Sequence, residues 1–165
     1  MSISQQFIAE LERLASQEIV EGSATILLND GGYDLHCVVL DIDSIGCRLE
    51  RLTLKPENIS NTAIERLRKM ASELTKRLVY LLEPIAPVEF DREGASVQLR
   101  SKPPHKDDDG TQYYELVVNQ RGLQLCRYSK AVGDSRRVIS SQLTREVLCR
   151  LIADFYAVAC EWQPE

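Results

Sequence analysis

The pattern of residues 113–128 predicts a β-hairpin, and this prediction constrains the fold of the chain more than any other feature. Two runs rich in β-branched and aromatic residues flank the segment 119–122, whose Asn, Gln, Arg and Gly suit a turn. Alternate residues of the first run, such as Leu116 and Val118, share one face. A hairpin alone is barely stable in water, so it must pack against another element. We expect that element to be the amphipathic helix within residues 143–162, which ends the chain.

Apolar residues at helical intervals predict three amphipathic helices. The first is expected from about residue 4 to residue 16. The second should follow Pro56, with Thr62 and Glu65 forming a capping box at its start. The third carries the widest apolar stripe and should begin at one of the serines 140–141, because either is a good N-cap.

Segments that alternate, or that are short and continuously apolar, predict strands. Besides the hairpin, these segments are residues 24–29, 33–40, 45–54, 78–82, 88–91, 95–101 and 136–139. The first three predict a meander that turns first at residues 30–32, since glycine adopts positive φ at no steric cost. The run 78–82 predicts a strand buried on both faces, which the prolines within residues 83–87 should end. Residues 102–112, rich in Pro and Asp, predict a mobile surface loop.

Together these elements predict an α+β fold, with antiparallel strands in one or two sheets covered by three helices. A chain of 165 residues is most simply one domain, with residues of about 1–75 and 76–165 as subdomains that share a core. The order helix, three strands, helix in the acidic first half is loosely similar to the secretion chaperones of type III systems. The later strands depart from the shorter pattern of those chaperones, and we take no site or activity from the likeness.

The net charge of −5 arises entirely in the first half of the chain. Residues 1–75 hold 7 Lys and Arg against 12 Asp and Glu, whereas residues 76–165 hold 13 of each. General nucleic-acid binders are usually basic overall, so this charge disfavours that class. No apolar run approaches the roughly 20 residues of a membrane span, and residues 1–15 lack the pattern of a secretion signal. We therefore expect a cytoplasmic protein with no membrane partner.

The cysteines fit a reducing compartment, because their number is odd and no pair has CxxC spacing. We expect buried, reduced thiols that behave as small apolar side chains at Cys37, Cys47, Cys126, Cys149 and Cys160. The chain holds none of the short motifs for phosphate, dinucleotide, hydrolase or zinc-protease sites. The sequence therefore indicates no cofactor and no metal.

A few acidic and histidine residues are candidates for chemistry. In an extended segment the carboxylates of Asp41 and Asp43 would point the same way, close enough to share a metal or to separate their pKa values. His36 is the nearby candidate base, and it cannot meet Cys37 because neighbours on a strand face opposite sides. The acidic loop 105–110 lacks the spacing of a calcium-binding loop, so we expect it to be solvated.

Cations at strand ends in the second half give the strongest functional signal. If the strands are neighbours, six cations converge on one rim of the sheet with two tyrosines close by, a surface that suits an anionic partner. The other interpretation is a solvated sheet edge whose charges discourage aggregation. The candidate binding residues are Arg100, Lys102, Tyr113, Arg127, Tyr128, Lys130, Arg136 and Arg137.

The function that we favour from the sequence is a non-enzymatic cytoplasmic module that binds protein, either as a monomer or as a homodimer. The residues expected on its binding face are Tyr113, Arg127, Tyr128, Arg136 and Arg137. One alternative is an enzyme built around His36, Asp41 and Asp43. The other is a protein that binds RNA or another anionic ligand through the cationic rim.

Overall fold

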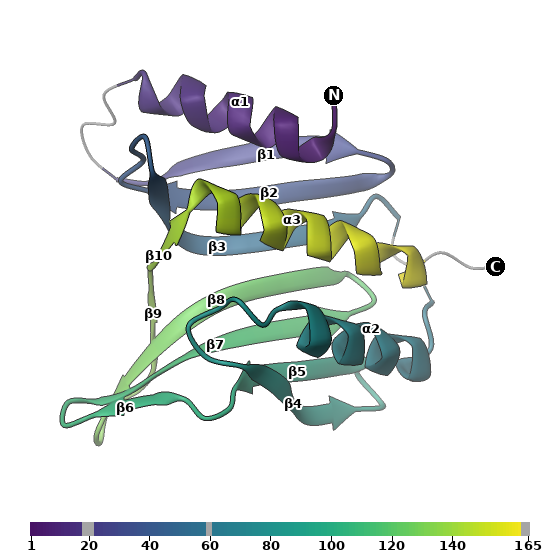
Figure 1. Ribbon diagram of the computed structural model, residues 1–165. Coiled ribbons are helices and arrows are strands. Elements are labelled where there is room, and N and C mark those ends of the chain that lie inside the picture. The colour runs from purple at the N-terminus through teal and green to yellow at the C-terminus, as the bar shows by residue number, and fades with distance from the viewer. Residues whose placement is uncertain (18–21, 59–60, 163–165) are drawn as a thin grey trace.

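The computed structural model describes residues 1–17, 22–58 and 61–162. In these residues ten strands form one antiparallel sheet, and the helices lie on one of its faces (Figure 1). The helices are α1 (Ile3–Ala15), α2 (Ile64–Arg77) and α3 (Arg145–Ala159), followed by the 3-10 turn η1 (Cys160–Trp162). The strands are β1 (Ala24–Asp30), β2 (Tyr33–Leu40), β3 (Gly46–Pro56), β4 (Ile85–Asp91), β5 (Ser96–Ser101), β6 (His105–Asp107), β7 (Gly110–Asn119), β8 (Gly122–Ala131), β9 (Arg137–Ile139) and β10 (Ser141–Thr144). The fold is α+β, as the sequence predicts.

The strands follow the order β1-β2-β3-β8-β7-β5-β4 across the sheet. The predicted meander is confirmed as β1, β2 and β3, and the predicted hairpin as β7 and β8. Gly31 and Gly32 have φ of 61° and 86°, the positive values that a tight type I′ hairpin turn requires. Because β8 pairs with β3, one sheet spans both halves of the chain.

A gap between β3 and β8 is filled by the last two strands. β3 and β8 pair with each other only over residues 51–54 of β3 and 123–126 of β8. Beyond that stretch β9 pairs with β8 and β10 pairs with β3, so one chain segment bridges both edges of the gap. The Oγ1 of Thr144, at the end of β10, accepts a hydrogen bond from the N–H of Val147 and thereby caps α3.

The three helices cover different strands. α1 contacts β1, α2 contacts β4, β5 and β7, and α3 lies between them over β3 and β10. The sequence predicts that the last helix, α3, packs across the hairpin formed by β7 and β8. This prediction is wrong, because α2 covers β7 and α3 covers β3 and β10. Near the turn of the hairpin, Trp162 of η1, just beyond α3, donates from its Nε1 to the Asn119 carbonyl at 3.0 Å. No helix in the described ranges is long and apolar enough to cross a membrane.

Residues 78–82 do not form the buried strand that their apolar run predicts. The N–H of Leu78 donates to the Leu74 carbonyl, so Leu78 closes α2, and the chain then turns toward β4. Leu78 and Leu81 are buried, whereas Leu82 is 72% exposed. A buried residue at every third position suits a turn after a helix rather than a strand.

Proline does not stop pairing where the sequence suggests. β4 includes Pro87, with a shift of register between Pro87 and Glu89. β4 is the edge strand, so an absent N–H on its free side costs no ladder bond.

Both predicted helix caps are wrong. α2 begins after Ala63 with no side-chain cap, and Thr62 Oγ1 donates instead to the Trp162 carbonyl at 3.4 Å. α3 begins after Thr144 rather than at a serine, because residues 141–144 pair with β3 as a strand.

The expected loop 102–112 is also corrected. β6 folds back onto β7 across a tight turn, in which Asp107 Oδ1 accepts from the N–H groups of Asp109 and Gly110. An aspartate that bonds the backbone two or three residues ahead stabilises such a turn.

Candidate functional site

The sheet face opposite the helices gathers four of the eight predicted binding residues. Tyr113 and Tyr128 are register partners on β7 and β8, and Arg100 lies on the neighbouring β5. Arg136 reaches them from the connection between β8 and β9. Within the described part of the chain, no helix packs on this face. We call Arg100, Tyr113, Glu115, Tyr128 and Arg136 the arginine–tyrosine cluster.

One buried carboxylate holds the two arginines of the cluster. Arg100 Nε donates to Glu115 Oε2 at 3.0 Å, and Arg136 Nη1 donates to the same oxygen at 2.6 Å. The Glu115 side chain is only 5% exposed, whereas those of Arg100 and Arg136 are 40% and 38% exposed. The carboxylate is therefore covered by two guanidinium groups that still face solvent.

The tyrosine rings fix both guanidinium groups in place. The two rings lie 5.9 Å apart, centre to centre. Arg100 Cζ stands 5.2 Å from the centre of the Tyr113 ring, and Arg136 Cζ stands 4.0 Å from that of Tyr128. Such cation–π contacts restrain the arginines without using their hydrogen-bond donors.

The cluster is cationic. Hydrogen bonds to Glu115 and Tyr113 raise the pKa of Arg136 above its ordinary value, so this group stays charged. Burial is the main reason why the pKa of Tyr128 is raised, so its ring stays neutral. Two guanidinium groups therefore face one carboxylate. A third cation, Arg51, lies on the same face. Cys126 of β8 pairs with Glu115 of β7 on one side and with Arg51 of β3 on the other, so the three residues lie in one line across the strands.

The other predicted binding residues lie elsewhere. Arg127 is the register partner of Tyr114 and points to the helix-covered face. Lys102, Lys130 and Arg137 are exposed and form no ion pair within the described ranges. The expected single rim is thus divided between the two faces of the sheet.

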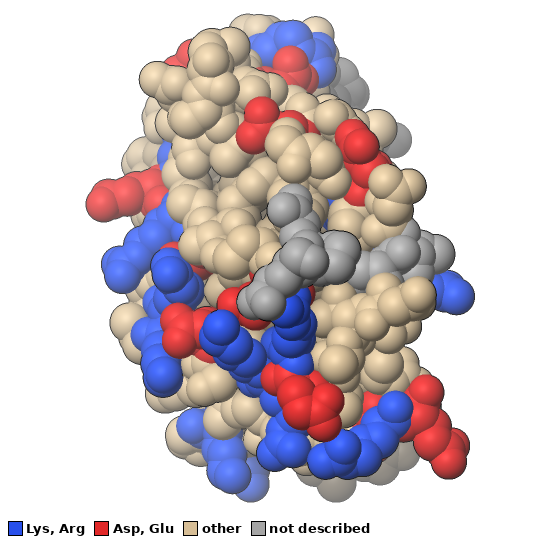
Figure 2. All heavy atoms as spheres, turned by 90° about the vertical axis from the view of Figure 1, so that its right-hand side faces the viewer, with Lys and Arg blue, Asp and Glu red and all other residues tan. Residues whose placement is uncertain are grey.

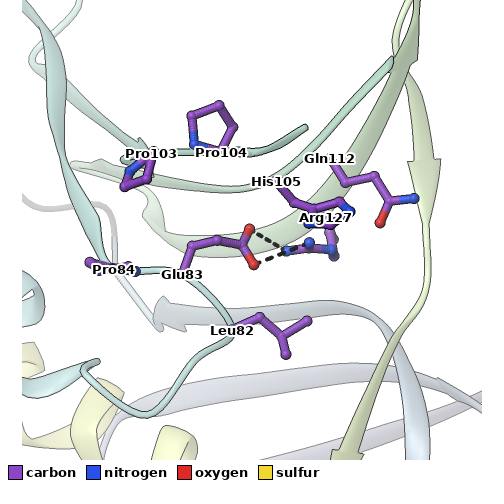
Figure 3. Close-up of a pocket in the computed structure, with 8 residues that line it drawn as sticks. All are labelled: Leu82, Glu83, Pro84, Pro103, Pro104, His105, Gln112 and Arg127. Carbon is purple, nitrogen blue, oxygen red and sulfur yellow. Dashed lines mark hydrogen bonds and ion pairs between the residues drawn. The ribbon is translucent and has the colours of Figure 1, made fainter. Parts of the chain in front are cut away.

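Arg127 lines a pocket together with its ion-pair partner Glu83 (Figure 3). Its Nη1 and Nη2 donate to Glu83 Oε1 and Oε2 at 2.9 and 3.2 Å. The side chains of Arg127 and Glu83 are 4% and 12% exposed, so this is a buried, bidentate ion pair. The cavity measures about 540 Å³ and is lined by Leu82, Glu83, Pro84, Pro103, Pro104, His105, Gln112 and Arg127.

The ring of Tyr114 stacks against the guanidinium of this ion pair. Arg127 Cζ lies 4.5 Å from the centre of the Tyr114 ring. The hydroxyl groups of Tyr114 and Ser141 are hydrogen-bonded at 2.7 Å, and the N–H of Tyr114 donates to Ser101 Oγ. Burial raises the pKa of Tyr114. Because Glu83 already takes the donors at the end of Arg127, this pocket is electrically balanced.

The structure does not bring the candidate catalytic residues together. Asp41 pairs with Arg48, and Asp43 Oδ1 accepts from the N–H groups of Ile45 and Gly46. His36 lies in the middle of β2, five residues before Asp41, which is about 16 Å along a strand. In the described residues no three His, Cys, Asp or Glu side chains are grouped so that they could hold a metal ion.

The cysteines are all free, and burial varies among them. Cys37, Cys47 and Cys126 are buried as expected, and Cys149 is half-buried. The expectation of a buried thiol is wrong for Cys160, which is exposed beyond the end of α3.

A second group of cations lies on α2, and acids pair with several of its members. Figure 2 shows Lys and Arg interspersed with Asp and Glu over the half of the molecule that contains α2. Lys69 pairs with Glu161, and Arg77 pairs with Asp154 and Glu73. These ion pairs neutralise several cations of α2, whereas Arg68 stacks on the Phe90 ring, with its Cζ 4.5 Å from the ring centre.

Two residues that organise the sites are missed by the sequence reasoning. Glu115 alternates with Tyr114 and shares a face with Tyr113, so strand periodicity signals its position. Glu83 carries no comparable signal, because it is 44 residues from Arg127 along the chain.

Comparisons with protein-family models, with curated proteins and with solved structures found no match for this chain.

Proposed function

We propose that this protein is a cytoplasmic, non-enzymatic module that binds an acidic segment of a partner protein through the arginine–tyrosine cluster. One observation supports this most: Arg100 and Arg136 share the buried Glu115 carboxylate while both remain more than a third exposed. The free state of all five cysteines supports a reducing compartment.

The donors of the cluster fit carboxylate or phosphate oxygens. Each guanidinium has five N–H donors in a planar fork, and Glu115 takes one from each. Arg136 also bonds Tyr113, and the other donors are held in place by stacking on Tyr113 and Tyr128. Because these arginines are already restrained, binding an anion costs them less conformational entropy.

An acidic protein segment suits this face better than RNA. The chain carries a net charge of −5, which opposes a long phosphate backbone. A short acidic segment needs only a local positive field, such as that of Arg51, Arg100 and Arg136 around Glu115. The half-exposed Tyr113 and Tyr128 rings add apolar contact area of the kind that protein interfaces favour.

Fluorescence anisotropy tests this proposal with three labelled probes: a glutamate-rich peptide, a phosphoserine peptide and a single-stranded RNA. The Arg100→Gln/Arg136→Gln variant should weaken peptide binding at least about tenfold, which corresponds to about 1.4 kcal/mol. The matched control is Arg92→Gln, which removes an exposed arginine of the β4–β5 turn that pairs with Glu65. It should leave the affinity unchanged.

Equal peptide affinity in the double variant and the wild type would refute the proposal. Tighter binding of RNA than of either peptide, with a steep decrease in added salt, would assign the cluster to nucleic acid instead.

A further inference from the structure

The two edges of the sheet differ in how well they are protected. β4 carries devices that discourage strand pairing, namely Pro87, a shift of register, and the acidic Glu89 and Asp91. β1 has the sequence Ala-Thr-Ile-Leu-Leu-Asn-Asp, with no proline and no lysine or arginine. Its register with β2 is unbroken over all seven residues. In the described residues no strand pairs with its outer edge.

The turn that follows β1 decides which backbone groups point outward. Asp30 and Tyr33 flank the two-residue type I′ turn, so they are a hydrogen-bonded pair. Backbone groups alternate along an antiparallel strand, so those of Thr25, Leu27 and Asn29 point away from β2. Leu27 is also 62% exposed, on the sheet face opposite the helices. The edge therefore offers both free backbone groups and an uncovered apolar side chain.

The geometry points to a second copy of this chain as the occupant of the β1 edge, paired antiparallel about a two-fold axis through Leu27. In this register Leu27 faces its own symmetry mate, Thr25 faces Asn29, and Ile26 faces Leu28. Asp30, the only charged residue of β1, faces Ala24. The strand is thus complementary to itself, with apolar residues opposite apolar residues and no like charges opposed.

The helix beside this edge is compatible with the arrangement. Glu12 of α1 lies 3.8 Å from Arg145 of α3, so the flank of α1 that carries Glu12 faces α3. The opposite flank, at helical spacing, carries Gln6, Glu10 and Arg13. The two-fold axis places this flank beside its symmetry mate. One acid and one base per copy keep the paired flanks neutral, with Glu10 and Arg13 bonded to each other at 2.9 Å in each chain.

Light scattering coupled to size-exclusion chromatography tests the dimer, and charge pairing at residue 27 tests its register. The wild type should elute with twice the 18.7 kDa mass of one chain. Leu27→Lys alone and Leu27→Glu alone should each be monomeric, because like charges meet on the axis. An equimolar mixture of the two variants should recover the dimer mass. The matched control is Val132→Lys, which alters an 87% exposed valine far from β1 and should remain dimeric.

A monomeric wild type at the highest soluble concentration would overturn the inference. So would dimers that persist in both single variants, or a mixture of the variants that stays monomeric. Circular dichroism of each variant establishes that a loss of mass reflects dissociation rather than unfolding. None of these outcomes depends on an acidic ligand, so the dimer and the proposed binding function are tested separately.

Discussion

Removing Glu83 should destabilise the protein strongly, because it would leave the Arg127 guanidinium buried without a counter-charge. Arg127 is 4% exposed and both of its terminal nitrogens bond to Glu83. Breaking a buried ion pair by removing one partner costs about 3–5 kcal/mol. For a protein of this size, each kcal/mol lowers Tm by about 2–4 °C, so Glu83→Gln should lower Tm by about 6–20 °C.

Urea unfolding followed by Trp162 fluorescence would measure this loss, because the chain has one tryptophan and it is 2% exposed. The Arg127→Met/Glu83→Gln variant should recover much of the stability, because it removes the buried charge altogether. The control is Glu65→Gln, at an ion pair in which both side chains are 68% exposed, and it should leave the unfolding midpoint nearly unchanged. A cost below about 1 kcal/mol for Glu83→Gln would show instead that water reaches the Arg127 guanidinium, so that the ion pair is not buried in solution.

Gly46, the cysteines and Asp43 each offer a further test of the fold. Gly46→Ala should cost about 1–3 kcal/mol in urea unfolding, because a Cβ there would overlap the Leu143 carbonyl and separate β10 from β3; an unchanged midpoint would contradict this contact. A thiol reagent at neutral pH should label Cys160 first in the native protein, because burial raises the pKa of Cys47 to about 11 and also raises that of Cys37. Mass spectrometry that finds Cys37 labelled as fast as Cys160 would contradict this burial. Backbone hydrogen bonds from Gly46 and Ile45 lower the pKa of Asp43 below its usual 3.8. The ionised Asp43 carboxylate therefore stabilises the fold above pH 3.8, and this stabilisation is lost as the pH falls through the lowered pKa. Asp43→Ala should be less stable than wild type at neutral pH, and the difference should vanish in acid.

The hairpins were predictable because their information is local. Gly31 and Gly32 set a turn, and alternating apolar residues on either side set the faces of β1 and β2. The run 78–82 misled because periodicity alone cannot separate a buried strand from the end of a helix. The predicted start of α3 failed because the pairing of β10 with β3 joins residues far apart in sequence.

Half of the candidate site could be predicted, and strand alternation explains the division. Tyr113 and Tyr128 lie on one face, whereas Arg127, as the neighbour of Tyr128, must lie on the other. Strand alternation also places Glu115 on the face of Tyr113, but nothing in the sequence links Glu83 to Arg127. Glu83 meets Arg127 only once α2 and the turn after it are placed over the sheet.

Binding of acidic segments by the arginine–tyrosine cluster can be tested residue by residue in an NMR titration. A glutamate-rich peptide would be added to the isotope-labelled protein while the backbone and arginine side-chain signals are followed. We expect saturable shifts centred on Arg100, Tyr113, Tyr128 and Arg136, with little change around Arg127 or along α2. Shifts confined to α2 or to the pocket around Arg127, or no shifts at a saturating amount of peptide, would contradict it.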